Sequence, residues 1–93
     1  MDEDVLEFKG VAGSQRRITV PRTYVVAYEL WEGELVKVHL YNAKNFGDSD
    51  FLTRVQKGFR IQIPSVEYKE LKADRISILQ IKIQKVKKEK QQN

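Results

Sequence analysis

The sequence of 93 residues has no cysteine, only two prolines and no long apolar run. The lack of cysteine excludes disulfides and thiolate metal sites and fits a reducing compartment, so we expect a cytoplasmic protein. No stretch approaches the roughly 20 apolar residues that span a bilayer. The acidic start, MDEDVLEF, also lacks the apolar core of a secretory signal. We therefore expect no membrane association.

Motifs for catalysis are missing too. The five glycines are scattered, so no phosphate-binding glycine-rich loop is present. The segment GSQRR at residues 13–17 holds a serine, but no histidine and acid stand in a motif that would complete a triad. The single histidine, His39, is expected on the polar face of a strand, without ligands at metal-site spacing. We expect no enzyme activity, no cofactor and no metal site.

Positive charge gathers at one end of the chain. The formal net charge is +4, and residues 82–93 alone hold five lysines and one glutamate. Such an end attracts polyanions, or it only keeps the chain soluble, and both interpretations stay open. The charged fraction of 32% without cysteine is typical of a thermophile.

The two prolines mark an internal repeat. RITVP at residues 17–21 recurs as RIQIP at 60–64, an offset of 43, and Phe8 falls on Phe51 at the same offset. Beyond the prolines, a gap of two residues aligns further aliphatic pairs: Leu30 with Leu71, Leu35 with Ile76, Val38 with Leu79 and Leu40 with Ile81. We predict two homologous halves, about 8–41 and 51–83, followed by a basic tail at 84–93.

Each half predicts a strand, a short helix, a turn and a second strand. RRITV and RIQI alternate as half-buried strands, and a proline ends each of them. Their inward residues are predicted to be Ile18, Val20, Ile61 and Ile63. The helices are expected in RTYVVAYEL and VEYKEL, the latter capped by Ser65. The turns follow as WEGE and KADR.

The closing strands are predicted as LVKVHLY and ISILQIKI. We expect Leu35 or Val36 to lie on one side of the first strand together with Val38 and Leu40. The apolar residues of the second include Ile76, Ile81 and Ile83, with a bulge where Ile78 and Leu79 break the alternation. NAKNFGDSD, residues 42–50, has the composition of a turn. A half of about 35 residues is too small for its own core, so both halves must share one, with approximate two-fold symmetry. Residues 1–93 are thus expected to form one domain.

The segment RRITVPRTYVVAYELWEGELVKVHL, residues 16–40, resembles the swapped-hairpin DNA-binding domain of the AbrB and MazE families of prokaryotic transcription regulators and antitoxins. The shared pattern is Arg-Ile-Thr-Val-Pro, a short helix, then Leu-x-x-Gly-Glu and an aliphatic strand. Residues 59–81 match it more loosely, with Asp74 in place of the turn glycine. Because the motif occurs twice in one chain, the sequence also resembles the small archaeal cradle-loop barrels of the RIFT type.

The resemblance implies a mainly β, small α+β fold: a single-chain, pseudo-two-fold, six-stranded β-barrel with two short helices. In relatives with one copy of the motif, two chains build the barrel together. Here the second half of the chain takes the place of the second subunit, so a monomer is expected. A homodimer holding four copies of the motif is the alternative.

The resemblance further implies a non-enzymatic, AbrB-like regulator that binds duplex DNA through basic residues before and around the Arg-Ile strands. The candidate nucleic-acid-binding residues are Lys9, Arg16, Arg17, Arg22, Arg54, Lys57 and Arg60. Arginine suits this role because its planar fork binds phosphate or guanine through two hydrogen bonds.

Two alternatives stay open. The arginines are also explained as the solvated face of a strand, and the second half has Phe59 where the first has Arg16. A minimal barrel that binds a protein or small ligand, with no DNA-binding role, has the same pattern. Trp31 is expected to cover the end of the core, and the helical tyrosines are expected in the core rather than as a base-stacking platform: Tyr24, Tyr28 and Tyr68.

Overall fold

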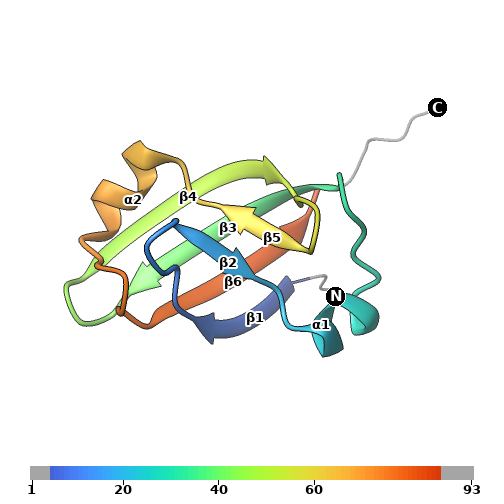
Figure 1. Ribbon diagram of the computed structural model, residues 1–93, viewed down its shortest axis with the longest axis horizontal. Helices are drawn as coiled ribbons and strands as arrows, with labels where there is room; N and C mark the ends of the chain where they lie inside the picture. Colours follow the sequence, from blue (N-terminus) through green and yellow to red (C-terminus); the bar gives the residue numbers. More distant parts are fainter. Residues whose placement is uncertain (1–4, 87–93) are drawn as a thin grey trace.

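A computed structural model describes residues 5–86 of the protein. These residues form a small, mainly β, α+β fold with two short helices (Figure 1). The elements in chain order are β1 (Val5–Gly10), β2 (Arg17–Thr19), α1 (Arg22–Ala27), β3 (Leu35–Asn42), β4 (Gly47–Arg54), β5 (Arg60–Gln62), α2 (Ser65–Leu71) and β6 (Leu79–Lys85).

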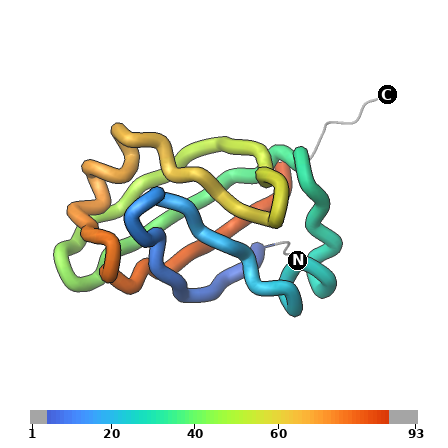
Figure 2. The backbone as a smooth tube through the Cα atoms, viewed as in Figure 1, coloured from blue at the N-terminus to red at the C-terminus, as the bar shows by residue number. Residues whose placement is uncertain are grey.

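The strands form two sheets. Four strands pair in the order β1-β6-β3-β4, and β2 pairs with β5 in a separate antiparallel ribbon. The ribbon lies across one face of the larger sheet, with α1 and α2 at opposite ends of the molecule (Figures 1 and 2). The core fills the space between the two sheets, because the buried side chains of both sheets belong to one cluster.

The pairing pattern is unchanged when the two halves are exchanged. Replacing β1, β2 and β3 by β4, β5 and β6 turns the order β1-β6-β3-β4 into its own reverse and leaves β2–β5 as it is. The approximate two-fold axis therefore passes between β3 and β6 and through the ribbon. Ile18 stands directly opposite Ile61 there, and both side chains are fully buried.

The two-fold relation holds at a constant offset of 43 residues. Left-handed backbone conformations recur at this spacing, with φ of 57° at Arg16 and 58° at Phe59, and 53° at Glu29 and 55° at Lys72. Phe8 pairs with Ile81, while Phe51 pairs with Val38. Strand register thus relates Val38 to Ile81, so the two-residue gap in the sequence alignment, which matched Val38 with Leu79, is wrong.

Alternation along the strands was predicted correctly for most of the core. Ile18, Val20, Ile61 and Ile63 are all buried, and in β3 the inward residue is Val36 rather than Leu35. Since successive side chains of a strand point to opposite faces, Val36 also directs Val38 and Leu40 inward.

The expected closed six-stranded barrel is replaced by two open sheets within residues 5–86. The ribbon strands are only three residues long, because Pro21 and Pro64 follow them closely and cannot donate to a ladder. Among the named strands of residues 5–86, each ribbon strand therefore pairs only with the other, and Arg60 of β5 adds an isolated bridge to Gln56.

Three local predictions were wrong. Strand β4 begins at Gly47, so the turn inside the predicted segment 42–50 is limited to residues 43–46. Strand β6 begins at Leu79 without a bulge, which leaves Ile76 and Ile78 exposed before it. The N-cap of α2 is Pro64, and Ser65 makes no capping hydrogen bond.

The first two residues of the predicted basic tail, 84–85, belong to β6, and residues 87–93 lie outside the described range. Neither helix found between residues 5 and 86 has the length and apolar character needed to cross a membrane.

Candidate nucleic-acid interface

The ribbon presents polar side chains on its outer face. Register places Arg17 opposite Gln62 and Thr19 opposite Arg60, while the central pair Ile18 and Ile61 points into the core. The two arginines are 43 residues apart and related by the two-fold. A pair of equivalent cations thus faces outward around the axis.

The loops before β2 and β5 are tied to the opposite ribbon strand. The carbonyl of Arg16 accepts a hydrogen bond from the backbone N–H of Ile63 at 2.9 Å, and that of Phe59 accepts one from Val20, also at 2.9 Å. Arg16 and Phe59 occupy equivalent left-handed positions. The two loops therefore have fixed positions relative to the outer face.

Gln62 holds the side chain of Arg17. Its Oε1 accepts a hydrogen bond from Arg17 Nε at 3.0 Å. Its Nε2 donates to the carbonyls of Gln15 at 3.0 Å and Arg16 at 3.1 Å. One amide thus connects the β1–β2 loop, the ribbon and a cationic side chain.

Arg60 is held differently. Its Nε donates to the carbonyl of Lys57 at 3.3 Å, within its own loop. The same loop is fixed by Glu32, whose Oε2 accepts from the backbone N–H of Gly58 at 2.7 Å. The carboxylate of Glu32 also lowers the positive potential on this side of the site.

The seven sequence-predicted residues divide into two groups. Lys9 in β1 and Arg54 in β4 are exposed on the outer face of the four-stranded sheet, where Arg54 Nη1 donates to the carbonyl of Gly33 at 3.1 Å. The ribbon, its loops and the adjoining start of α1 bring the other five together: Arg16, Arg17, Arg22, Lys57 and Arg60.

Sequence reasoning missed Gln62 on this face, whereas the alternation of RRITV already places Thr19 on the same strand face as Arg17. The alternation that predicts Arg17 and Arg60 outward also predicts their partners outward, so the signal was present. The amide of Gln62 contributes to this face by holding Arg17, since it accepts from Arg17 and donates to two loop carbonyls.

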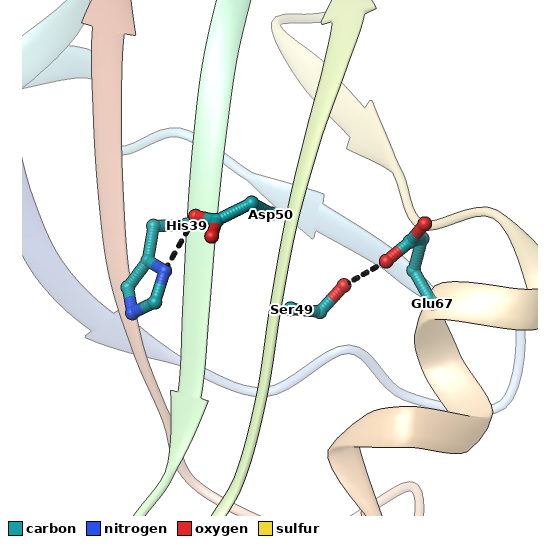
Figure 3. Close-up of polar contacts among 4 residues, drawn as sticks. All are labelled: His39, Ser49, Asp50 and Glu67. Atoms are coloured by element: carbon teal, nitrogen blue, oxygen red, sulfur yellow. Dashed lines mark hydrogen bonds and ion pairs between the residues drawn. The ribbon is translucent and has the colours of Figure 1, made fainter.

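A row of polar and charged side chains crosses the outer face of the four-stranded sheet. Register aligns Glu7, Lys82, His39 and Asp50 on four neighbouring strands. His39 Nδ1 lies 2.6 Å from Asp50 Oδ1 (Figure 3). His39 thus lies on an outward strand face as predicted, but its acidic partner is a cross-strand neighbour that sequence spacing hid. Within residues 5–86, no three acidic or histidine side chains gather as a metal site.

A second polar contact in Figure 3 joins Ser49 of β4 to α2. The Ser49 hydroxyl donates to Glu67 Oε1, and Ser49 is buried. The contact attaches the helix to the edge of the sheet.

The aromatic predictions had mixed outcomes. Tyr24, Tyr28 and Tyr68 pack against the core as predicted, and Tyr24 lies beside Phe8 with ring centroids 5.7 Å apart. Trp31 is 58% exposed, so its predicted packing over the end of the core is wrong. It follows α1 in a turn that directs its indole outward.

A groove of about 380 Å³ opens beside the ribbon, at the start of α1. Its walls are mainly apolar, with the side chains of Val25, Val26 and Phe59, and Arg22 adds a cation. The volume lies within the range of about 300–1,000 Å³ that small-molecule sites occupy.

No protein-family model matches the chain, and neither does any curated protein. Among solved structures, the fold is similar to the solution structure of PHS018 from Pyrococcus horikoshii, with a TM-score of 0.77. The similarity covers 95% of this chain and all of PHS018, at 17% sequence identity. At that identity the likeness establishes a common fold.

Proposed function

We propose that the protein binds double-stranded DNA through the outer face of the β2–β5 ribbon. The observation that carries the proposal is the two-fold pair Arg17 and Arg60 on an exposed antiparallel ribbon. A two-stranded ribbon fits the major groove of B-DNA, which is about 12 Å wide. In this proposal the protein acts as a regulator-like DNA-binding protein and not as an enzyme.

The flanking cations support this interpretation. Arg22 and Lys57 are exposed beside the ribbon and Arg16 is half-buried there, with its Nε buried. Contacts of lysine and arginine with phosphates supply most of the affinity for a duplex. Residues 5–86 hold 14 basic and nine acidic side chains, so the folded part is itself positively charged. Phosphate contacts give affinity and orientation, while Arg17 contacts base edges in this proposal.

We further propose that the chain acts as a monomer related to the cradle-loop barrels. The repeated ββαβ order and the cross-connections from Val20 to Phe59 and from Ile63 to Arg16 support this relation. In this proposal, the two halves of one chain replace the two subunits of a swapped-hairpin dimer.

The test measures binding of a fluorescent 24-base-pair duplex by anisotropy across a salt series. The wild-type chain is compared with Arg17→Ala/Arg60→Ala and with a variant in which Lys87, Lys88 and Lys90 are glutamine. We expect the double arginine variant to lose at least tenfold in affinity, because two phosphate or base contacts disappear.

A matched control for charge is Lys9→Ala/Arg54→Ala, which removes two cations from the opposite sheet. This control should change affinity far less than the ribbon variant does. If only the lysine-to-glutamine variant loses binding, the ribbon is not the interface. Truncation is avoided because β6 extends to Lys85, and Ile83 is part of the core.

A second candidate function is the binding of a small ligand in the groove beside α1. The apolar walls formed by Val25, Val26 and Phe59 favour it. The test is a fragment screen by ¹H–¹⁵N NMR, with Val26→Glu as the variant that blocks the groove. Shifts confined to groove residues and lost in that variant would support this function, whereas an unchanged spectrum would oppose it.

A further inference from the structure

We propose that the ribbon binds its ligand asymmetrically, with Arg17 as the directional contact and Arg60 as a positive charge only. This inference rests on the proposed function, because it concerns how that same face meets a duplex. Its starting point is the two-fold: Arg17 is equivalent to Arg60, and Gln62 is equivalent to Thr19. The equivalent positions hold different chemistry.

We call β2 with the loop before it the first arm of the ribbon, and β5 with the loop before it the second arm. On the first arm, a residue of the neighbouring strand fixes the guanidinium of Arg17. Gln62 Oε1 accepts from Arg17 Nε at 3.0 Å, and the Gln62 amide is itself fixed by two loop carbonyls. Among residues 5–86, the Nη groups of Arg17 make no hydrogen bond or ion pair. The plane of the fork is thus set, while its two Nη groups, with four N–H donors between them, remain for a ligand.

The second arm lacks this clamp. Thr19 is too short to reach across as Gln62 does, and Arg60 Nε turns back to the carbonyl of Lys57. The guanidinium lies against Gly58, where a Cβ atom would come within 3.2 Å of its nitrogens. In addition, Phe59 stands where the first arm has Arg16, and the cation of the second loop is Lys57 instead.

A fixed guanidinium loses less conformational freedom on binding and can make two parallel hydrogen bonds to a phosphate or to guanine O6 and N7. A guanidinium folded against its own loop contributes mainly through its charge. Arg17 therefore determines specificity, and Gln62 is a positioning residue that acts through Arg17. The protein should then bind a palindromic duplex no more tightly than a non-palindromic one.

The experiment uses full-length protein and one fluorescent duplex. Arg17→Lys and Arg60→Lys keep the charge but remove the fork. Gln62→Ala and Thr19→Ala form the second matched pair, at equivalent positions. We expect Arg17→Lys and Gln62→Ala to weaken binding about tenfold, as for the loss of one bidentate contact, and the other two to stay within about twofold.

A double-mutant cycle separates positioning from a structural role. Gln62→Ala should have no effect when Arg17 is already alanine, because the clamp then has nothing to hold. If Gln62→Ala weakens binding as much in the Arg17→Ala background as in the wild type, Gln62 does not act through Arg17 and its positioning role is overturned. Equal losses for Arg17→Lys and Arg60→Lys would overturn the asymmetry but leave the proposed function intact. If neither Arg17→Ala nor Arg60→Ala weakens binding, both proposals fail.

Discussion

Asp74 illustrates how a single residue sets the end of an element. Its Oδ1 accepts hydrogen bonds from the backbone N–H of Ile76 and from the hydroxyl of Ser77, and Ser77 Oγ accepts from the Asp74 N–H. The turn closed in this way keeps Ile76 and Ile78 outside β6. The alternation of apolar residues predicted a strand there. That pattern does not account for the side-chain hydrogen bonds of Asp74 and Ser77, which occupy backbone N–H groups that a strand would use for pairing.

The hydrogen bond from Ser77 is the largest cause that lowers the pKa of Asp74 below its ordinary value of 3.8. We expect Ser77→Ala to raise this pKa, measured from the ¹³C shift of the carboxyl during an NMR titration. A pKa lowered on folding means that the ionised form stabilises the fold above pH 3.8. That contribution disappears as the pH falls through the lowered value.

The matched control is Ser65→Ala, which removes an exposed hydroxyl that makes no capping bond. It should leave the titration of Asp74 unchanged. A Ser77→Ala chain whose Asp74 titrates as in the wild type would show that the hydroxyl does not stabilise the carboxylate.

At the scale of the elements, the contact between the β3–β4 hairpin and α2 depends on a glycine, Gly47. Gly47 packs against the backbone at the end of α2, so an added Cβ would overlap the carbonyl of Leu71. The buried Asn42 opposite it donates to the carbonyls of Leu71 at 3.1 Å and Lys72 at 3.2 Å. A glycine and a buried amide thus attach the helix to the hairpin.

Gly47→Ala is expected to lower the free energy of unfolding by about 1–3 kcal/mol, the usual cost of overpacking. Chemical denaturation monitored by circular dichroism measures it. Gly10→Ala is the control, because a Cβ at this strand glycine would meet Ile81 at an ordinary 3.4 Å. Equal effects of the two substitutions would contradict the close approach at Gly47.

The sequence pattern predicted both helices and the strands β2, β3, β5 and β6, but it assigned no strand to β1 or β4, and several boundaries were wrong. Period-two alternation identified the inward isoleucines of β2 and β5, and the two prolines marked the strand ends. The start of β4 at Gly47 was missed because Gly, Asp and Ser have turn composition, yet Ser49 faces inward in a strand. Pairing with β3 overrides that local preference.

The candidate interface was predictable in the same partial way. Alternation placed Arg17 and Arg60 outward, but their closeness depends on the antiparallel pairing of β2 with β5, which lie 43 residues apart. Lys9 and Arg54 seemed equally suited by charge, and only the sheet order separates them from the ribbon. The cross-strand pair of His39 and Asp50 was hidden for the same reason.

For the molecule as a whole, the two-fold places one residue of each half at the centre of the ribbon, so we expect their contributions to stability to be coupled. Ile18 and Ile61 stand directly opposite each other on the axis, each fully buried. Ile→Ala at either position should cost about 2–5 kcal/mol. Because they are direct neighbours, we expect the double variant to differ from the sum of the single variants by at least 0.5 kcal/mol, a coupling on the order seen for contacting residues.

Urea denaturation of the three variants and the wild type measures this coupling energy. Additivity of the two losses would show that the halves pack independently at the axis. That result would contradict the expected coupling between the two halves of the chain at the centre of the ribbon.

The pairing of Val5 with Gln84 has a consequence for chain connectivity. It brings the start of β1 beside the end of β6, in the position that the exposed 43–46 turn occupies between β3 and β4 at the other end of the molecule. A circular permutant that began at Gly47, joined residue 86 to residue 5 through a short linker and ended at Asn42 would keep every strand pairing described above. The strand pairing of this fold is therefore compatible with either half coming first in the chain.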